Sequence, residues 1–87
     1  MYVISKTVTI TFKDGLHMRP AADLVAACRP FDASSSMVFN GQAINLKSVL
    51  GVVGAHVKHG DTIELKCDGP QAAEAMAALA SVINSER

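Results

Sequence analysis

Apolar and polar residues alternate along two stretches of the chain, residues 3–12 and residues 62–68. In the first stretch, the apolar residues of one face are Ile4, Val8, Ile10 and Phe12. In the second stretch, they are Ile63, Leu65 and Cys67. A period of two residues is typical of a β-strand with one buried face. The pattern therefore predicts two half-buried strands whose polar faces meet solvent.

Three other stretches have helical character. Residues 18–29 repeat apolar residues at the three- and four-residue spacing of a buried stripe, at Ala21, Leu24, Val25 and Cys28. Residues 71–84 do the same at Ala72, Met76, Leu79, Ala80 and Ile83. Residues 49–55 predict a short helix that is apolar on nearly every side. We expect Pro30 to end the first helix and Pro70 to lie near the first position of the last.

Two short apolar runs, Met37–Phe39 and Ala43–Leu46, flank Asn40-Gly41, a dipeptide that strongly favours a tight hairpin turn. The residues before them, 33–36, predict a short polar link, and residues 56–61 predict a turn. The predicted order is β-α-β-β-α-β-α. This order favours an α+β fold in which helices cover one face of a sheet.

Composition narrows the classes of function. A length of 87 residues suits one domain, residues 1–87. The balance of 8 Lys and Arg against 8 Asp and Glu, with few aromatic residues, argues against a nucleic-acid-binding protein. No apolar run approaches the roughly 20 residues of a transmembrane helix, and the start of the chain lacks the pattern of a signal peptide. We therefore expect a cytoplasmic protein without membrane insertion.

Neither the cysteines nor two of the histidines suggest a metal site. Cys28 and Cys67 lack metal-ligand spacing, and we expect both to be buried, reduced thiols. His56 and His59 lie in a predicted turn without a pattern of acids or thiols, so we expect turn residues and no bound metal.

Residues 15–20 predict a loop that leads into a helix. Gly15 permits unusual backbone angles, and Pro20 suits the first helical turn. His17 should therefore lie at or just before the N-cap, beside free N–H groups and the positive end of the helix dipole. Arg19 adds a fork of donors suited to phosphate oxygens. Such a histidine is a candidate nucleophile that carries a phosphoryl group.

Two motifs resemble those of HPr, the phosphocarrier family of the bacterial phosphoenolpyruvate-dependent sugar phosphotransferase system. Residues 15–22 are similar to the family's Gly-Leu-His-Ala-Arg-Pro-Ala signature, with Met18 in place of the usual Ala. Residues 45–51 resemble its regulatory serine motif. The resemblance covers essentially the whole chain. It implies a two-layer, open-faced β-sandwich with an antiparallel four-stranded sheet in the order 1-4-2-3 and three helices on one face.

The resemblance also implies a carrier rather than an enzyme with turnover of its own, and no cofactor. His17 would accept a phosphoryl group on Nδ1 from Enzyme I and pass it to an Enzyme IIA domain during sugar uptake. Arg19 would contact that group, which the backbone amides of Met18 and Arg19 would face. Ser48 matches the serine that an HPr kinase/phosphorylase modifies in many low-GC Gram-positive relatives, where the modification controls sugar uptake and binding to a catabolite-control repressor.

The chain departs from the family's pattern near the histidine. Met18 enlarges the residue whose amide should face the phosphate, and Asp14 puts a negative charge near a site meant to hold one. Pro30 shortens the first helix, and Ala55-His56 replaces the more usual Leu-Gly after the second helix. No departure removes a reacting group.

Structural roles compete with the functional ones. Arg19 can be a solvated residue, and Ser48 can simply cap the second helix. Val49, Leu50 and Val53 can be core residues or an exposed patch on which partners dock.

Two further functions stay open beside a monomeric phosphoryl carrier. One is a regulatory HPr-like protein that acts mainly through Ser48-dependent partner binding. The other is a dimeric small-molecule sensor, although nothing in the sequence marks a ligand site. The presence of His17 favours the carrier.

Overall fold

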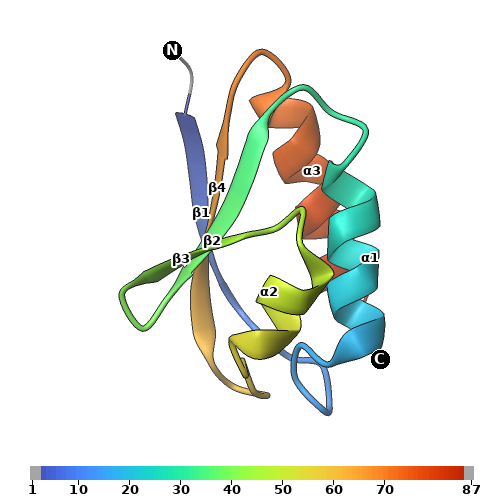
Figure 1. Ribbon diagram of the computed structural model, residues 1–87, viewed down its shortest axis with the longest axis vertical. Coiled ribbons are helices and arrows are strands. Elements are labelled where there is room, and N and C mark those ends of the chain that lie inside the picture. Colours follow the sequence, from blue (N-terminus) through green and yellow to red (C-terminus); the bar gives the residue numbers. More distant parts are fainter. Residues whose placement is uncertain (1–2, 86–87) are drawn as a thin grey trace.

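The computed structural model describes residues 3–85. Its elements are β1 (Val3–Thr9), α1 (Met18–Cys28), β2 (Ser34–Phe39), β3 (Gln42–Asn45), α2 (Val49–Gly54), β4 (Thr62–Asp68) and α3 (Ala72–Asn84). The strands form one antiparallel sheet in the order β1-β4-β2-β3. All three helices lie on one face of this sheet (Figure 1). The predicted α+β open-faced sandwich in the order 1-4-2-3 is therefore confirmed.

The hairpin between β2 and β3 turns at Asn40-Gly41, as predicted. Both residues have positive φ, 53° at Asn40 and 78° at Gly41, as a two-residue hairpin turn requires. They join Phe39 directly to its partner Gln42. The turn therefore sets the register of this strand pair.

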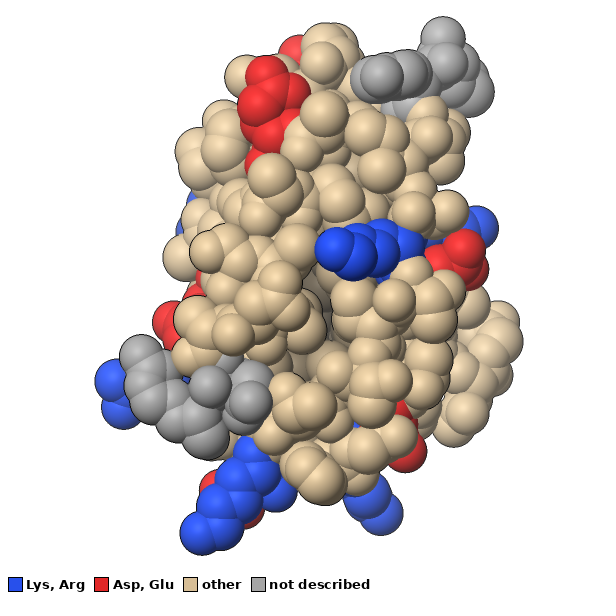
Figure 2. Space-filling view, turned by 180° about the vertical axis from the view of Figure 1, so that it is seen from behind, with Lys and Arg blue, Asp and Glu red and all other residues tan. Residues whose placement is uncertain are grey.

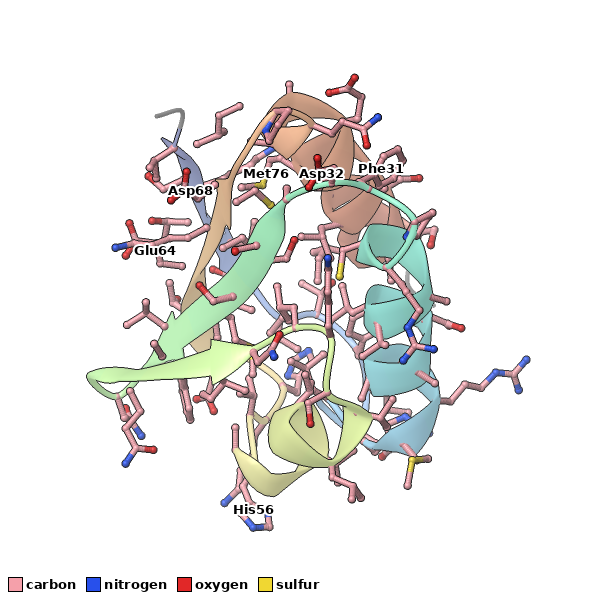
Figure 3. The ribbon with its side chains drawn as sticks, turned by 45° about the horizontal axis from the view of Figure 1, so that its top comes forward. Phe31, Asp32, His56, Glu64, Asp68 and Met76 are labelled. Atoms are coloured by element: carbon pink, nitrogen blue, oxygen red, sulfur yellow. The ribbon has the colours of Figure 1, made fainter. Side chains whose placement is uncertain are left out.

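The open face of the sheet is polar. On β4, residues 62, 64, 66 and 68 alternate with the buried residues Ile63, Leu65 and Cys67. Glu64 and Asp68 accordingly project from the sheet on the side away from the helices (Figure 3). The strand predicted over residues 62–68 is confirmed at both ends.

The prediction of a polar link at residues 33–36 is wrong for its last three residues, which belong to β2. Ser34 and Ser36 pair with Asp68 and Lys66 of β4. Between them, Ser35 is only 4% exposed, and its hydroxyl lies 3.7 Å from the Cys67 sulfur. Pairing with a central strand outweighs the low strand preference of serine.

The first strand ends earlier than predicted. β1 ends at Thr9 rather than at residue 12, because Ile10 leaves the strand register. The Ile10 N–H donates to the Asp61 carbonyl at 2.8 Å, and the Gly60 N–H donates to the Ile10 carbonyl at 2.7 Å. Ile10 is still fully buried, as the alternation predicts.

Pro70 does not start the last helix, because α3 begins at Ala72 with Gln71 as its N-cap. Gln71 and Asp32 hold each other through two hydrogen bonds. The Gln71 N–H donates to the Asp32 carbonyl at 3.1 Å, and the Asp32 N–H donates to Gln71 Oε1 at 2.7 Å. This pairing keeps Gln71 outside the helix and Pro70 one residue before the cap.

The core lies between the sheet and the helices. The stripe predicted on α1 is fully buried, and on α3 the buried residues are Ala72, Ala75, Met76, Leu79 and Ile83. Ala80 is only half-buried, and Ala75 takes its predicted place. Two loop residues, Leu16 and Val57, are also core residues that no periodic pattern marks.

Both cysteines are free thiols and fully buried, as predicted. Cys28 lies on α1, where its thiol donates to the Leu46 carbonyl at 3.5 Å, and Cys67 lies on β4. Burial raises the pKa of each thiol above its ordinary value, against the weaker lowering effects of the Ser35 hydroxyl and the Lys47 ammonium. None of the helices within residues 3–85 is long and apolar enough to cross a membrane.

Candidate functional site

His17 lies at the N-cap of α1, as the loop-to-helix pattern predicts. Its backbone is extended, and its carbonyl accepts the first helical hydrogen bond from the Ala21 N–H at 3.0 Å. The side chain is exposed and makes no capping hydrogen bond. The first-turn N–H groups of Met18 and Arg19 have no partner within the helix. An exposed imidazole therefore stands beside donors that an anion can use.

The loop before His17 is fixed against residues 57–58. The Leu16 N–H donates to the Val57 carbonyl at 2.9 Å. Gly15 has a φ of +71°, and a Cβ there would overlap the Val57 carbonyl and lie 2.8 Å from Lys58 Cα. Only glycine fits this approach, so the backbone that carries His17 is held at a defined place.

Two hollows flank His17. The first, of about 280 Å³, lies between the loop, the start of α1 and the end of α3. Its charged residues are Lys13, Asp14, Arg19 and Asp23. The second, of about 220 Å³, lies between the loop and the segment after α2. It is lined by Asp14, Leu16, His17, Val53, His56, Val57 and Lys58.

Cations are present on both sides of the imidazole. Arg19 and Lys13 line the first hollow, and Lys58 lines the second. Lys and Arg side chains project from the lower end of the molecule in Figure 2, the end that carries the loop before α1 in Figure 1. Asp14 lines both hollows and opposes this positive charge. A bound anion would therefore gain from the cations and the helix dipole and lose from Asp14.

Ser48 is the N-cap of α2. Its Oγ accepts a hydrogen bond from the Gly51 N–H at 3.1 Å, and the residue is half-buried. The structure thus gives Ser48 the capping role, which is compatible with modification of the same hydroxyl.

The apolar residues of α2 divide between core and surface. Leu50 is 79% exposed, whereas Val49 and Val53 are half-buried and pack against the core. Val53 also lines the second hollow with His17, so α2 borders the candidate site. Met18, which follows His17, is 55% exposed and adds apolar surface that the sequence had not indicated.

His56 also lines the second hollow, although only a turn role was predicted for it. It has a φ of +58°, in the left-handed region. The signal that could have identified it is histidine in place of the usual glycine. Within the described part of the chain, no group of three or more His, Cys, Asp or Glu is arranged to hold a metal ion.

Comparison with known sequences bears on the site. The family model for the phosphorylation site of the PTS HPr component matches residues 4–85. A multiphosphoryl transfer protein from Vibrio cholerae serotype O1 is 37% identical over 84 residues. That match covers 91% of this chain and 21% of the relative, so the chain spans about a fifth of the length of that protein.

Solved structures share the fold at similar levels of identity. HPr-C-His from Thermoanaerobacter tengcongensis has a TM-score of 0.90 at 32% identity, covering 94% of this chain and 92% of the other. A phosphocarrier protein HPr from Bacillus anthracis str. Ames has a TM-score of 0.88 at 31% identity, covering 95% and 99%. Crh from Bacillus subtilis, described as a dimer with a swapped domain, has a TM-score of 0.75 at 29% identity, covering 95% of each chain.

Proposed function

The chain belongs to the HPr family of phosphocarrier proteins of the phosphotransferase system, and on that premise we propose that His17 is its phosphoacceptor. In this proposal His17 takes a phosphoryl group from Enzyme I, which derives it from phosphoenolpyruvate, and passes it to an Enzyme IIA domain. The observation that carries the proposal is the exposed, uncapped imidazole of His17 at the start of α1.

The transfer chemistry needs little from the carrier. The unprotonated Nδ1 of His17 attacks phosphorus as the bond between phosphorus and the atom that holds it on Enzyme I breaks, and that atom keeps the electron pair of the bond. The N–H groups of Met18 and Arg19 and the Arg19 guanidinium then hold the phosphoryl oxygens. Arginine in a first helical turn opposes the helix dipole, at a cost of a few tenths of a kcal/mol. An anion that visits the site offsets this cost.

The exposed surface of α2 supports a proposal for where partners bind. We propose that Enzyme I and Enzyme IIA press against Leu50, with the exposed parts of Val49 and Val53, while they reach His17. In the same scheme, phosphorylation of Ser48 by an HPr kinase/phosphorylase regulates transfer and partner choice. Its support is the half-buried Ser48 hydroxyl directly before this surface.

A labelling experiment tests the central role of His17. After incubation with Enzyme I and phosphoenolpyruvate, intact mass should show one acid-labile phosphate on the wild type and none on His17→Ala. The exposed turn residue His59 is the matched control, because His59→Ala changes an imidazole outside both hollows. Phosphate on His17→Ala at the wild-type rate would refute the proposal.

A further inference from the structure

The second hollow beside His17 contains a residue to which the family's pattern assigns no role. We propose that His56, with Lys58, contacts the phosphoryl group carried by His17 and prolongs its lifetime there. This inference rests on the proposed function, because it deepens the description of the same site.

The backbone brings His56 next to His17. Gly15 approaches Lys58, and Leu16 donates to Val57, so the two segments run past each other in opposite directions. His17 follows Leu16 in one segment and His56 precedes Val57 in the other, so the two histidines are the next residues to face each other. Both residues line the same hollow of about 220 Å³.

The conformation of His56 is unfavourable for any residue with a side chain. Its φ of +58° lies in the left-handed region, where glycine is normally found at the end of a helix. Its N–H donates to the Val53 carbonyl at 3.2 Å, as expected for a residue that closes α2. A histidine that replaces the usual glycine here accepts strain, and strained residues of this kind cluster at functional sites.

The ring of His56 is free to move. Figure 3 shows it at the end of α2, projecting from the lower edge of the molecule. The side chain is exposed, and no hydrogen bond fixes it within the described residues. Rotation of this side chain about χ1 therefore costs no hydrogen bond.

Asp14 gives this chain a reason for further donors beside those of Met18 and Arg19. Its carboxylate lines the same hollow and repels a phosphoryl dianion. His56 and Lys58 offset that repulsion with an N–H donor and a full positive charge. Phosphoryl transfer is governed by the position of the phosphoryl group and by the charges around its oxygens. Donors that contact those oxygens better while the group rests on His17 than while it departs stabilise the phosphohistidine more than the transition state for its hydrolysis.

The test is the lifetime of phosphohistidine in the absence of any partner. Wild type, His56→Gly and His59→Ala are phosphorylated with phosphoramidate, and the ³¹P resonance of phospho-His17 is followed at one mildly alkaline pH. The resonance is assigned by its loss in His17→Ala. His56→Gly should shorten the half-life about threefold and shift the resonance, because one donor is lost. The same variant should melt at a higher temperature, since glycine relieves the strain, so misfolding cannot produce the effect.

Each outcome decides one point. Half-lives equal in His56→Gly and His59→Ala, with an unchanged resonance, would overturn the role of His56 and leave the proposed function standing. Asp14→Asn in the His56→Gly background should recover part of the lost lifetime, and no recovery would contradict the charge argument. Phosphorylation of His17 by phosphoramidate but not by Enzyme I would overturn the proposed transfer from Enzyme I, whereas the contact of His56 with phospho-His17 would still be decided by the half-lives.

Discussion

Gly15 and His56 use the left-handed region of backbone space in opposite ways. At Gly15, a side chain would meet the backbone of Val57 and Lys58, which cannot move aside without breaking the Leu16–Val57 hydrogen bond. At His56, the exposed side chain meets no such obstacle, and its only cost is the conformational strain of the positive φ. The first position therefore demands glycine for its space, and the second only prefers it.

Gly15→Ala should be strongly destabilising. The new methyl group overlaps the Val57 carbonyl and the φ of +71° is unfavourable, so we expect a loss of about 3 kcal/mol in the free energy of unfolding. Gly60→Ala is the matched control, since Gly60 also has positive φ, +92°, but has no atom near its would-be Cβ. That variant should lose about 1 kcal/mol, from strain alone. Urea denaturation of both variants measures the difference, and equal losses would contradict a steric role for Gly15.

The residues of the candidate site were only partly predictable from sequence. The place of His17 and Arg19 at a helix start follows from glycine, proline and the apolar spacing that comes after them. His56 and Lys58 could not be placed, because their approach to His17 depends on one contact between segments far apart in sequence. No local pattern encodes such a contact.

At the scale of an element, α2 combines a structural cap with an exposed surface. The helix has six residues, two of them glycine, so it depends on its cap and on Val52 in the core. Ser48 supplies the cap, and Leu50 follows two residues later on the surface. In the docking proposal, a charge added at Ser48 therefore lies at the edge of the surface that a partner contacts.

Ser48→Asp should slow transfer through His17 while the melting temperature stays nearly unchanged. Aspartate also caps helices well and suits the positive end of the helix dipole, so the fold tolerates it. At an apolar interface, however, the added charge must be desolvated, which costs binding energy. Ser48→Ala is the control with the opposite profile, because it loses about 1 kcal/mol of stability without adding charge. Enzyme I-dependent phosphorylation kinetics and thermal melting compare the three proteins, and equal transfer rates would exclude docking beside Ser48.

Element boundaries were predictable where the pattern is local. The period-two alternation identified β4, and Asn40-Gly41 identified the hairpin. The prediction failed where partners outside the segment decide the structure. Ser34–Ser36 join β2 because β4 offers a ladder, and the start of α3 moves because Gln71 binds Asp32.

At the scale of the whole molecule, alternation indicates which residues face inward but not which strands pair. The strand order came from the resemblance to HPr, and the structure confirms it. The helices cover one face of the sheet, so the buried residues of the helices pack against the buried residues of the sheet. Cys28 from α1 and Cys67 from β4 are two such residues, and together with Ser35 they place polar sulfur and oxygen inside the core.

Stability at alkaline pH should report on these thiols. Burial raises the pKa of both Cys28 and Cys67, so above the pKa of an unfolded cysteine, about 8.5, the folded chain keeps protons that the unfolded chain releases. The stabilisation is therefore complete below about pH 8.5 and is lost as the pH rises through the folded-state values. The slope of the free energy of unfolding against pH reaches about 1.4 kcal/mol per pH unit for each thiol.

Urea denaturation under reducing conditions tests this prediction. We expect the free energy of unfolding to fall more steeply at alkaline pH for the wild type than for the variant with both Cys28→Ala and Cys67→Ala. That variant is less stable at every pH, because it loses buried side-chain volume. Its lysines, which also titrate at alkaline pH, are the same as in the wild type. The difference in slope between the two proteins therefore reports on the thiols alone. Parallel declines would mean that the thiols ionise in the folded protein as easily as in the unfolded chain, and that the core between α1 and β4 admits water.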